Sequence, residues 1–202
     1  MSYSFRSGHK LTALGLTLMA VVAANCARAQ DVKQWAGACV ACHPRSSVAT
    51  SSVNPIIWGQ NAGYVYLQLR DFKAATRASE SDAAMHALTR TMTDAQMLSI
   101  AQYVAAQPWP ALQDKTAAGS DSLYSRGALL VAYGDCGACH FNNLQGYSVN
   151  PRIRGQTSSY LTTTINEFRS GKRGNSPGMA DLLRAYSEDD VKALVAYLSR
   201  AD

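Results

Sequence analysis

The same five-residue motif occurs twice in this chain of 202 residues, 97 positions apart. Residues 39–43 read Cys-Val-Ala-Cys-His, and residues 136–140 read Cys-Gly-Ala-Cys-His. Other residues recur at nearly the same separation, namely Asn54 and Asn150, Pro55 and Pro151, Gly59 and Gly155, Gln60 and Gln156, Tyr64 and Tyr160, Phe72 and Phe168, Met85 and Met179, and Tyr103 and Tyr197. Self-similarity at a fixed separation indicates two tandem copies of one structural unit.

The repeat divides the chain into two predicted domains, residues 30–107 and residues 122–202. Residues 108–121 lie between them and contain Pro108 and Pro110, followed by small and polar residues. Prolines and small polar residues favour a linker over a helix or a strand.

Each copy is predicted to be helical, because its apolar residues recur at helical spacing. These residues are Val65, Leu69 and Phe72 in the first copy and Leu161, Ile165 and Phe168 in the second. The last helix of each copy is predicted to begin at a capping box, Thr93-x-x-Gln96 or Ser187-x-x-Asp190, and to continue as one apolar stripe. No segment shows a convincing alternation of apolar and polar residues, so the predicted fold class is all-α.

The predicted domains are small, with about 80 residues each and few aromatic side chains. A core of that size is marginally stable without a disulfide, a metal or another large group. We therefore expect something large and apolar to fill each domain.

Residues 1–29 are predicted to be a secretory signal peptide rather than part of the fold. Arg6, His9 and Lys10 precede an apolar stretch over residues 11–24, and Ala-Arg-Ala follows at residues 27–29. This order of positive, apolar and small residues is typical of a signal that is cleaved, here after Ala29, during export to the bacterial periplasm. Retention of the segment as an anchor stays open.

The charge of the chain and the length of its apolar runs argue against two classes of protein. The chain has 19 Lys and Arg against 14 Asp and Glu, and residues 1–29 supply three of the five formal positive charges. No basic stripe remains in the rest of the chain, which argues against a nucleic-acid partner. No apolar run reaches the length of a membrane span, which excludes a polytopic membrane protein.

The four cysteines of the predicted mature chain are Cys39, Cys42, Cys136 and Cys139. Thiols are not left idle in an oxidising compartment. Cys-x-x-Cys-His is the attachment signature of c-type haem, in which two thiols form thioethers to the vinyl groups and the histidine becomes an axial iron ligand. The sequence therefore predicts two covalent haem c groups, with His43 and His140 as axial ligands.

Three other uses of the motif are weaker. A thioredoxin-like redox pair requires a βαβ context, which the sequence lacks. Structural zinc would require a fourth Cys or His in each domain, and only His86 is spare. A simple disulfide would not explain a histidine at the same place twice.

The second axial ligand is predicted to be Met85 in the first domain and Met179 in the second. They occupy equivalent places, and Met179 is the only methionine of its copy. His86, beside Met85, is the alternative ligand in the first domain. A neutral thioether favours Fe(II), and two axial ligands leave the iron no open position for a substrate. This ligation predicts an electron carrier rather than a catalyst.

With two such domains, the chain resembles cytochrome c4, a family of two-haem cytochromes of the bacterial periplasm. The shared pattern is Cys-x-x-Cys-His, then Asn-Pro, Gly-Gln-x-x-x-Tyr, a Phe ahead of basic residues, a Met and a last helix ending near a Tyr. Residues 59–73 are especially similar, and the resemblance covers the whole predicted mature chain.

The resemblance implies two cytochrome c-like helical domains, each wrapped around a covalent haem and related by a pseudo-twofold axis. It implies that the carbonyl groups of Pro55 and Pro151 orient His43 and His140, as outer partners of metal ligands do. It also places four polar residues near the haem propionates: Tyr64, Tyr160, Arg152 and Arg154.

The main functional hypothesis is a soluble carrier that passes single electrons between redox proteins. A quinol-oxidising complex or a dehydrogenase would be the donor, and a terminal oxidase or a reductase the acceptor, through small and weak interfaces. One alternative is a dedicated cytochrome subunit of a periplasmic or membrane-bound dehydrogenase complex. Another is a haem enzyme, such as a thiosulfate dehydrogenase or a peroxidase, which would need an open or reactive distal position. Peripheral association with a membrane is also left open.

Overall fold

The structure, a computed structural model, describes residues 32–45, 54–77, 79–110, 120–141 and 143–200. The predicted signal peptide and residues 111–119 of the predicted linker lie outside these ranges. Within them the regular elements are helices, together with one isolated bridge between Tyr147 and Asn150. The predicted all-α fold class is confirmed. In the described ranges, no helix is both long enough and apolar enough to cross a bilayer.

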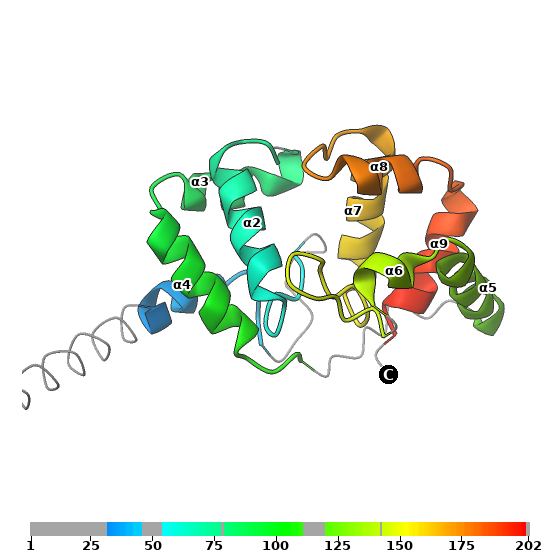
Figure 1. Cartoon of the computed structure of the whole chain (residues 1–202), viewed down its shortest axis with the longest axis horizontal. Helices are drawn as coiled ribbons and strands as arrows, with labels where there is room; N and C mark the ends of the chain where they lie inside the picture. Colours follow the sequence, from blue (N-terminus) through cyan, green and yellow to red (C-terminus); the bar gives the residue numbers. More distant parts are fainter. Residues whose placement is uncertain (1–31, 46–53, 78, 111–119, 142, 201–202) are drawn as a thin grey trace, which may run out of the picture.

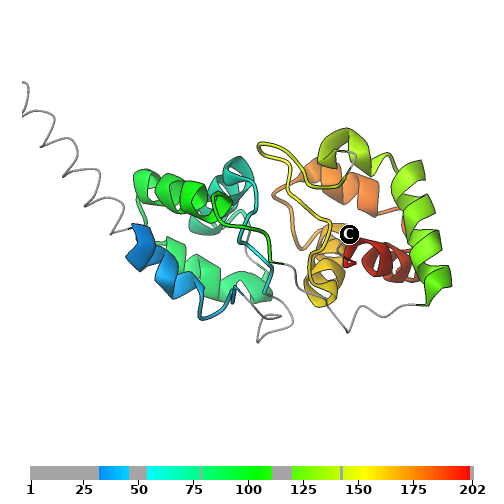
Figure 2. The same cartoon turned by 90° about the horizontal axis from the view of Figure 1, so that it is seen from below.

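Two groups of helices lie side by side in both views of the chain (Figures 1 and 2). We call residues 32–110 the first half and residues 120–200 the second half. The first half contains a helical segment over residues 32–39, α2 (Ala62–Lys73), the short 3-10 helix η1 (Glu80–Asp82), α3 (Ala83–Thr89) and α4 (Asp94–Ala105). The second half contains α5 (Asp121–Tyr133), α6 (Cys136–His140), α7 (Ser158–Ser170), α8 (Pro177–Leu183) and α9 (Glu188–Leu198).

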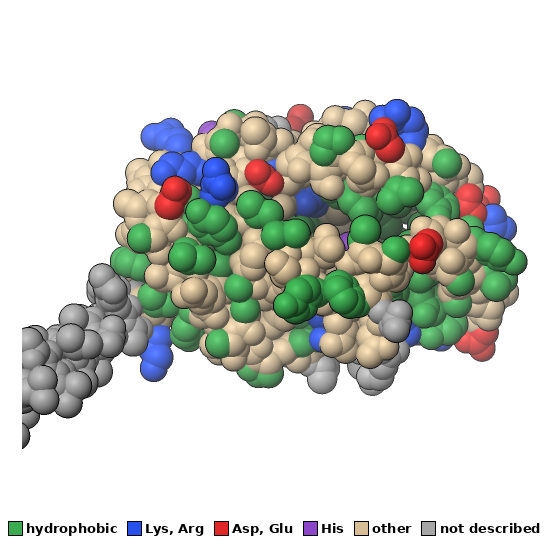
Figure 3. Space-filling model, viewed as in Figure 1, with side chains coloured by type: hydrophobic (Ala, Val, Ile, Leu, Met, Phe, Trp, Pro, Cys, Tyr) green, Lys and Arg blue, Asp and Glu red, His purple; other side chains and the backbone are tan. Residues whose placement is uncertain are grey.

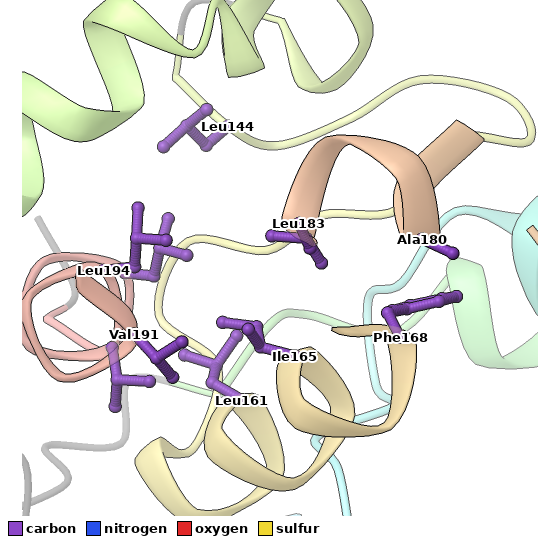
Figure 4. Packing of buried hydrophobic residues seen from close by; sticks show 10 residues of the cluster. Leu144, Leu161, Ile165, Phe168, Ala180, Leu183, Val191 and Leu194 are labelled. Carbon is purple, nitrogen blue, oxygen red and sulfur yellow. The ribbon is translucent and has the colours of Figure 1, made fainter. Parts of the chain in front are cut away.

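Each half has its own hydrophobic core. The first core is formed by Trp58, Leu69, Met97, Ile100 and Val104. The second is formed by Leu144, Leu161, Ile165, Phe168, Ala180, Leu183, Val191, Leu194, Val195 and Leu198. In Figure 4, the labelled side chains of α7, α8 and α9 face one another, and Leu144 faces them from the segment after α6. On the face seen in Figures 1 and 3, the space-filling view shows a hollow in the second half, with hydrophobic side chains around its opening.

The predicted capping boxes start α4 and α9. The amide of Gln96 donates to Thr93 Oγ1 at 3.2 Å, and the amide of Thr93 donates to Gln96 Oε1 at 2.8 Å. Ser187 and Asp190 exchange the same pair of bonds, at 3.2 and 3.0 Å. Both helices bury the predicted stripes, which are Met97, Ile100, Ala101 and Val104 in α4, and Val191, Leu194, Val195 and Leu198 in α9.

We expect acid to weaken the packing of α5 on α9, because the ionised carboxylate of Asp190 on α9 is the partner of Arg126 on α5. Hydrogen bonds from Arg126 of α5, at 2.7 Å, and from Ser187 lower the pKa of Asp190 to about 2. Since this folded-state pKa is below the ordinary value, the stabilisation is present above about pH 4 and is lost as the pH falls toward about 2. We expect the melting temperature of wild-type protein to fall more over this range than that of Asp190→Asn. If the melting temperatures of the two proteins fell in parallel as the pH is lowered, this role of Asp190 would be contradicted. The control is Asp94→Asn, which changes a carboxylate at the exposed start of α4.

The crossing of α5 and α9 depends on Gly127. A Cβ atom there would lie 2.6 Å from Tyr197 Cβ and closer still to the carbonyl oxygen of Ala193, so the helix backbones approach closely only without it. We expect Gly127→Ala to destabilise the second half by about 1–3 kcal/mol, the usual cost of overpacking. Urea unfolding would measure this cost.

The matched control for Gly127 is Gly37, a helical glycine at which an added Cβ atom would have no neighbour within 4 Å. There Gly37→Ala should be neutral or stabilising, because alanine has the higher helix propensity. Equal effects of the two substitutions would contradict the role of close approach at Gly127.

The two halves are joined by a reciprocal set of hydrogen bonds. Gln60 Nε2 donates to the Arg152 carbonyl at 2.9 Å, and the Arg152 amide donates to Gln60 Oε1 at 2.8 Å. Gln156 Nε2 donates to the Ile56 carbonyl at 3.0 Å, and the Ile56 amide donates to Gln156 Oε1 at 2.8 Å. Since both pairs are equivalent under the sequence repeat, each half presents the same patch to the other, as in a contact about a twofold axis.

Candidate haem-binding site

In each Cys-x-x-Cys-His motif the histidine is buried, and the two cysteines differ in exposure. Cys39 ends the helical segment over residues 32–39, and the second motif forms α6. His43 and His140 are buried, with 7% and 6% of their surface exposed. In each motif the first cysteine is half-buried and the second is exposed, and none of the four described cysteines forms a disulfide.

Both histidines are held by a proline carbonyl. His43 Nδ1 lies 2.8 Å from the carbonyl oxygen of Pro55, and His140 Nδ1 lies 2.8 Å from that of Pro151. Donation from Nδ1 leaves the lone pair on Nε2, which is the arrangement of an imidazole that binds a metal. Burial lowers the pKa of both imidazoles, while the bond to proline opposes the shift. Both rings are therefore kept neutral, as a metal ligand must be.

The two predicted methionine ligands border the same cores as the motifs. Met85 on α3 packs against the first core together with Cys39. Met179 on α8 packs against the second core together with Cys136. In each half the structure thus brings the methionine and the first cysteine of the motif to one core.

His86 is tied to another element. Its Nδ1 lies 2.7 Å from the carbonyl oxygen of Phe72, at the end of α2. Thr89 Oγ1 donates to the carbonyl of Met85 at 2.9 Å and fixes the turn of α3 that carries both residues. The Nδ1 contact of His86 is of the same kind as those of His43 and His140, so it does not decide between the two candidates. Met85 is favoured because it packs against the first core beside Cys39 and is equivalent to Met179 in the repeat.

Arg152 and Arg154, which the resemblance places near the propionates, also contact other parts of the protein. The Arg152 guanidinium lies 4.4 Å from the centre of the Trp109 ring. Arg154 donates to the carbonyl of Tyr197 on α9 at 3.0 Å and to Tyr124 Oη on α5 at 3.2 Å. The contact of Arg152 therefore joins the two halves, and those of Arg154 join α5 to α9 within the second half.

The residues that the sequence prediction missed are Arg77 and Arg173. Both are buried, at 6% and 3% exposure, and each guanidinium lies over a phenylalanine ring, 4.4 Å from that of Phe72 or 4.5 Å from that of Phe168. They are equivalent in the repeat, separated by 96 positions like Tyr64 and Tyr160. That equivalence was the signal that could have identified them.

Arg173 contacts the two predicted tyrosines where the two halves meet. Arg173 donates to Tyr64 Oη at 3.2 Å and to Tyr160 Oη at 3.4 Å. Although burial raises it, the charges of Arg77 and Arg173 lower the pKa of Tyr160 to about 7. Burial raises the pKa of Tyr64. The two shifts have opposite directions, and the arginine charges favour the ionised form only at Tyr160.

The residues present fit haem c. Each half offers two free thiols, of which the first packs against the core, together with a neutral imidazole and a thioether beside the same core. The buried guanidiniums between the halves suit propionate carboxylates. They fit structural zinc poorly, because the described residues contain no group of three His, Cys, Asp or Glu side chains that could hold a metal ion.

Comparison with known proteins gives the same answer. The family model for "Cytochrome c" matches residues 124–202. A "Thiosulfate dehydrogenase electron acceptor" of Stutzerimonas stutzeri (strain A1501) is 31% identical over 174 residues, covering 80% of this chain and 78% of that protein. "Cytochrome c4" of Thiocapsa roseopersicina is 31% identical over 169 residues, covering 80% of this chain and 86% of that protein.

A solved structure shares the fold. The crystal structure of reduced recombinant cytochrome c4 from Pseudomonas stutzeri aligns with a TM-score of 0.71 at 24% identity, covering 84% of this chain and 96% of that one. The sequence relatives and the common helical fold together establish the resemblance found in the motifs. The chain belongs to the cytochrome c4 family and is a c-type cytochrome with covalently bound haem that carries electrons.

Proposed function

We propose that the chain binds two haem c groups, one in each half, and passes single electrons between redox partner proteins. Cys39 and Cys42 would form the thioethers in the first half, and Cys136 and Cys139 those in the second. The proposed axial ligands are His43 and Met85 in the first half and His140 and Met179 in the second.

The observation that carries this proposal is the repeated geometry of the histidines. In each half, the histidine that directly follows the Cys-x-x-Cys pair has its Nδ1 2.8 Å from the carbonyl oxygen of a proline. A single haem would explain one such arrangement, whereas the chain contains two.

Bound haem supplies an iron that gains and loses one electron reversibly. The histidines would present a neutral, oriented Nε2 to it, with the proton kept on Nδ1 by the proline carbonyls. The methionine thioethers are neutral, which favours the reduced state and raises the reduction potential. A histidine and a methionine that both bind the iron would leave it no position for a substrate, so electron transfer is the reaction that these residues would support.

Export to the bacterial periplasm and cleavage after Ala29 are part of the proposal. The order of positive, apolar and small residues over residues 1–29 supports both. Redox proteins of that compartment would then be the partners, and peripheral membrane association is compatible with this location.

Reductive titration of the purified protein tests the proposal. We expect two electrons to be taken up per chain, with a low-spin spectrum throughout and no rapid binding of carbon monoxide or cyanide. Uptake of one electron per chain, or rapid binding of either ligand by the native protein, would contradict it.

A second candidate is the role of electron acceptor to a dehydrogenase that oxidises thiosulfate. It is supported by two relatives, from Stutzerimonas stutzeri and Thiomonas intermedia, that carry the name "Thiosulfate dehydrogenase electron acceptor". Mixing the oxidised protein with such an enzyme and thiosulfate distinguishes the roles: fast reduction favours this donor, and no reduction directs the search to quinol-oxidising complexes.

A further inference from the structure

Trp58 connects the buried histidine of the first half with an arginine at the protein surface. Its Nε1 donates to the carbonyl oxygen of His43 at 2.6 Å, and its side chain, with 1% of its surface exposed, belongs to the first core. Over the face of the indole, the guanidinium of Arg45 lies 4.0 Å from the centre of the ring, a favourable cation–π contact. The three residues form a continuous series of contacts from the proposed iron ligand outward.

The side chain of Arg45 is exposed, and its hydrogen-bond partners are neutral. Nη1 donates to Gln107 Oε1 at 2.6 Å, and Nη2 donates to Tyr103 Oη at 3.2 Å. In the part of the chain that the structure describes, no carboxylate lies within ion-pair distance of this guanidinium. An exposed guanidinium that is held in place but not neutralised is suited to bind a carboxylate of another protein.

The equivalent place in the second half is covered. Arg154 stands at the position that corresponds to Trp58, and it is 6% exposed. It donates to the carbonyl of Tyr197 on α9 and to Tyr124 Oη on α5, and the rings of these two tyrosines lie 5.1 Å apart. The guanidinium of the second half is thus enclosed between two helices and does not meet solvent as Arg45 does.

The flank of α4 is open where that of α9 is buried. Ala196 of α9 is 4% exposed, whereas Gln102, at the same place in α4, is exposed. In the repeat, residues 121–126, with which α5 begins, correspond to residues 24–29. Cleavage after Ala29 would remove these residues from the first half, so that a partner could reach the flank of α4 and Arg45 directly.

We propose that Arg45, Tyr103 and Gln107 form a docking surface at which the haem of the first half exchanges electrons with a redox protein that presents carboxylates. The inference rests on the proposed function, since it needs a haem bound to His43. An electron passes more readily along covalent and hydrogen bonds than across a gap, and Trp58 provides such a route from His43 to this surface. The charge of Arg45 speeds the encounter with an acidic partner. In each encounter one electron leaves one partner's redox centre and reduces the other's.

Two complex ions of opposite charge test the surface by electron transfer. Hexacyanoferrate(III) is an anion and tris(phenanthroline)cobalt(III) is a cation, and each takes one electron from the reduced protein in a stopped-flow experiment. Arg45→Gln should slow oxidation by the anion by on the order of three- to tenfold at low ionic strength, without slowing oxidation by the cation. The effect should disappear near about 1 M salt, where the Debye length is about 3 Å.

Binding is measured separately with hexacyanochromate(III), a paramagnetic anion of the same charge that takes no electron from the protein. It should broaden the NMR signal of the Trp58 indole N–H, and Arg45→Gln should remove this broadening. Trp58→Phe identifies the indole signal by its loss and removes the hydrogen bond to His43 while keeping a ring beside Arg45. Oxidation of this variant by hexacyanoferrate(III) should therefore be slower than that of wild type.

Arg90→Gln is the matched control, since it removes another exposed arginine of the first half, at the end of α3. It should preserve the broadening at Trp58 and slow oxidation by the anion much less than Arg45→Gln does. The inference is overturned if both variants slow this reaction equally, if Arg45→Gln slows oxidation by both ions alike, or if the broadening survives in Arg45→Gln. A chain without haem in the first half would instead overturn the proposed function, and intact mass shows this separately.

Discussion

Replacing both cysteines of the second motif, Cys136→Ser with Cys139→Ser, is expected to leave the second half without a stable fold. The described core of this half surrounds a hollow on the surface shown in Figure 3. A domain of this size buries little apolar surface. Loss of the group that fills it should therefore remove the whole free energy of unfolding of this half, about 5 kcal/mol or more. Limited proteolysis followed by mass spectrometry would find rapid cleavage after residue 120, with the first half protected.

The haem absorbance per chain should fall by half in the same variant. The reciprocal variant, Cys39→Ser with Cys42→Ser, should expose the first half and protect the second. The two double variants are matched controls for each other, because each makes the same chemical change in the opposite half. A compact, protease-resistant second half that lacks haem would show that the core does not depend on the cofactor.

Met179→Ala should have a different consequence, namely a haem that stays covalently attached and gains an open axial position. Loss of the thioether removes the ligand that favours Fe(II), so the potential of that haem should fall. Carbon monoxide and cyanide should then bind rapidly to one of the two haems. The near-infrared sulfur–iron band should lose about half its intensity, since each of two equivalent methionines supplies one such bond.

Two further substitutions make this result specific. Met97→Ala removes a fully buried methionine of the first core, with 0% exposure, and should cost about 2–5 kcal/mol of stability without changing the band. His86→Ala should also leave the band intact, because the proposed sulfur ligand of the first half is Met85, which packs against the first core. A full-intensity band in Met179→Ala would mean that another residue binds the second iron.

Features set by local sequence could be predicted. The starts of α4 and α9 depend on Thr93 with Gln96 and on Ser187 with Asp190, residues three positions apart. The buried stripes follow from helical periodicity in the same segments. The placement of His43 and His140 opposite two prolines was implied by the resemblance, and the structure has the same contacts.

Features set by contacts between the halves could not be predicted. Gln60 and Gln156 were visible as a repeated pair, yet their exchange of hydrogen bonds depends on how the two copies pack. The contacts of Arg152 with Trp109, and of Arg154 with residues of α5 and α9, were likewise not visible in the sequence. Nor was the burial of Arg77 and Arg173, each of which follows the end of α2 or α7 and folds back over a phenylalanine ring.

The intact mass of the exported protein, recorded together with its visible spectrum, shows whether the chain carries two covalent haems. We expect a chain that begins at Gln30, carries two covalently attached haems and shows a low-spin spectrum with the sulfur–iron band. A colourless chain with four unmodified thiols, made in cells that attach haem to other cytochromes, would be the opposite result, and a mass that contains one haem would also rule out the two-haem proposal.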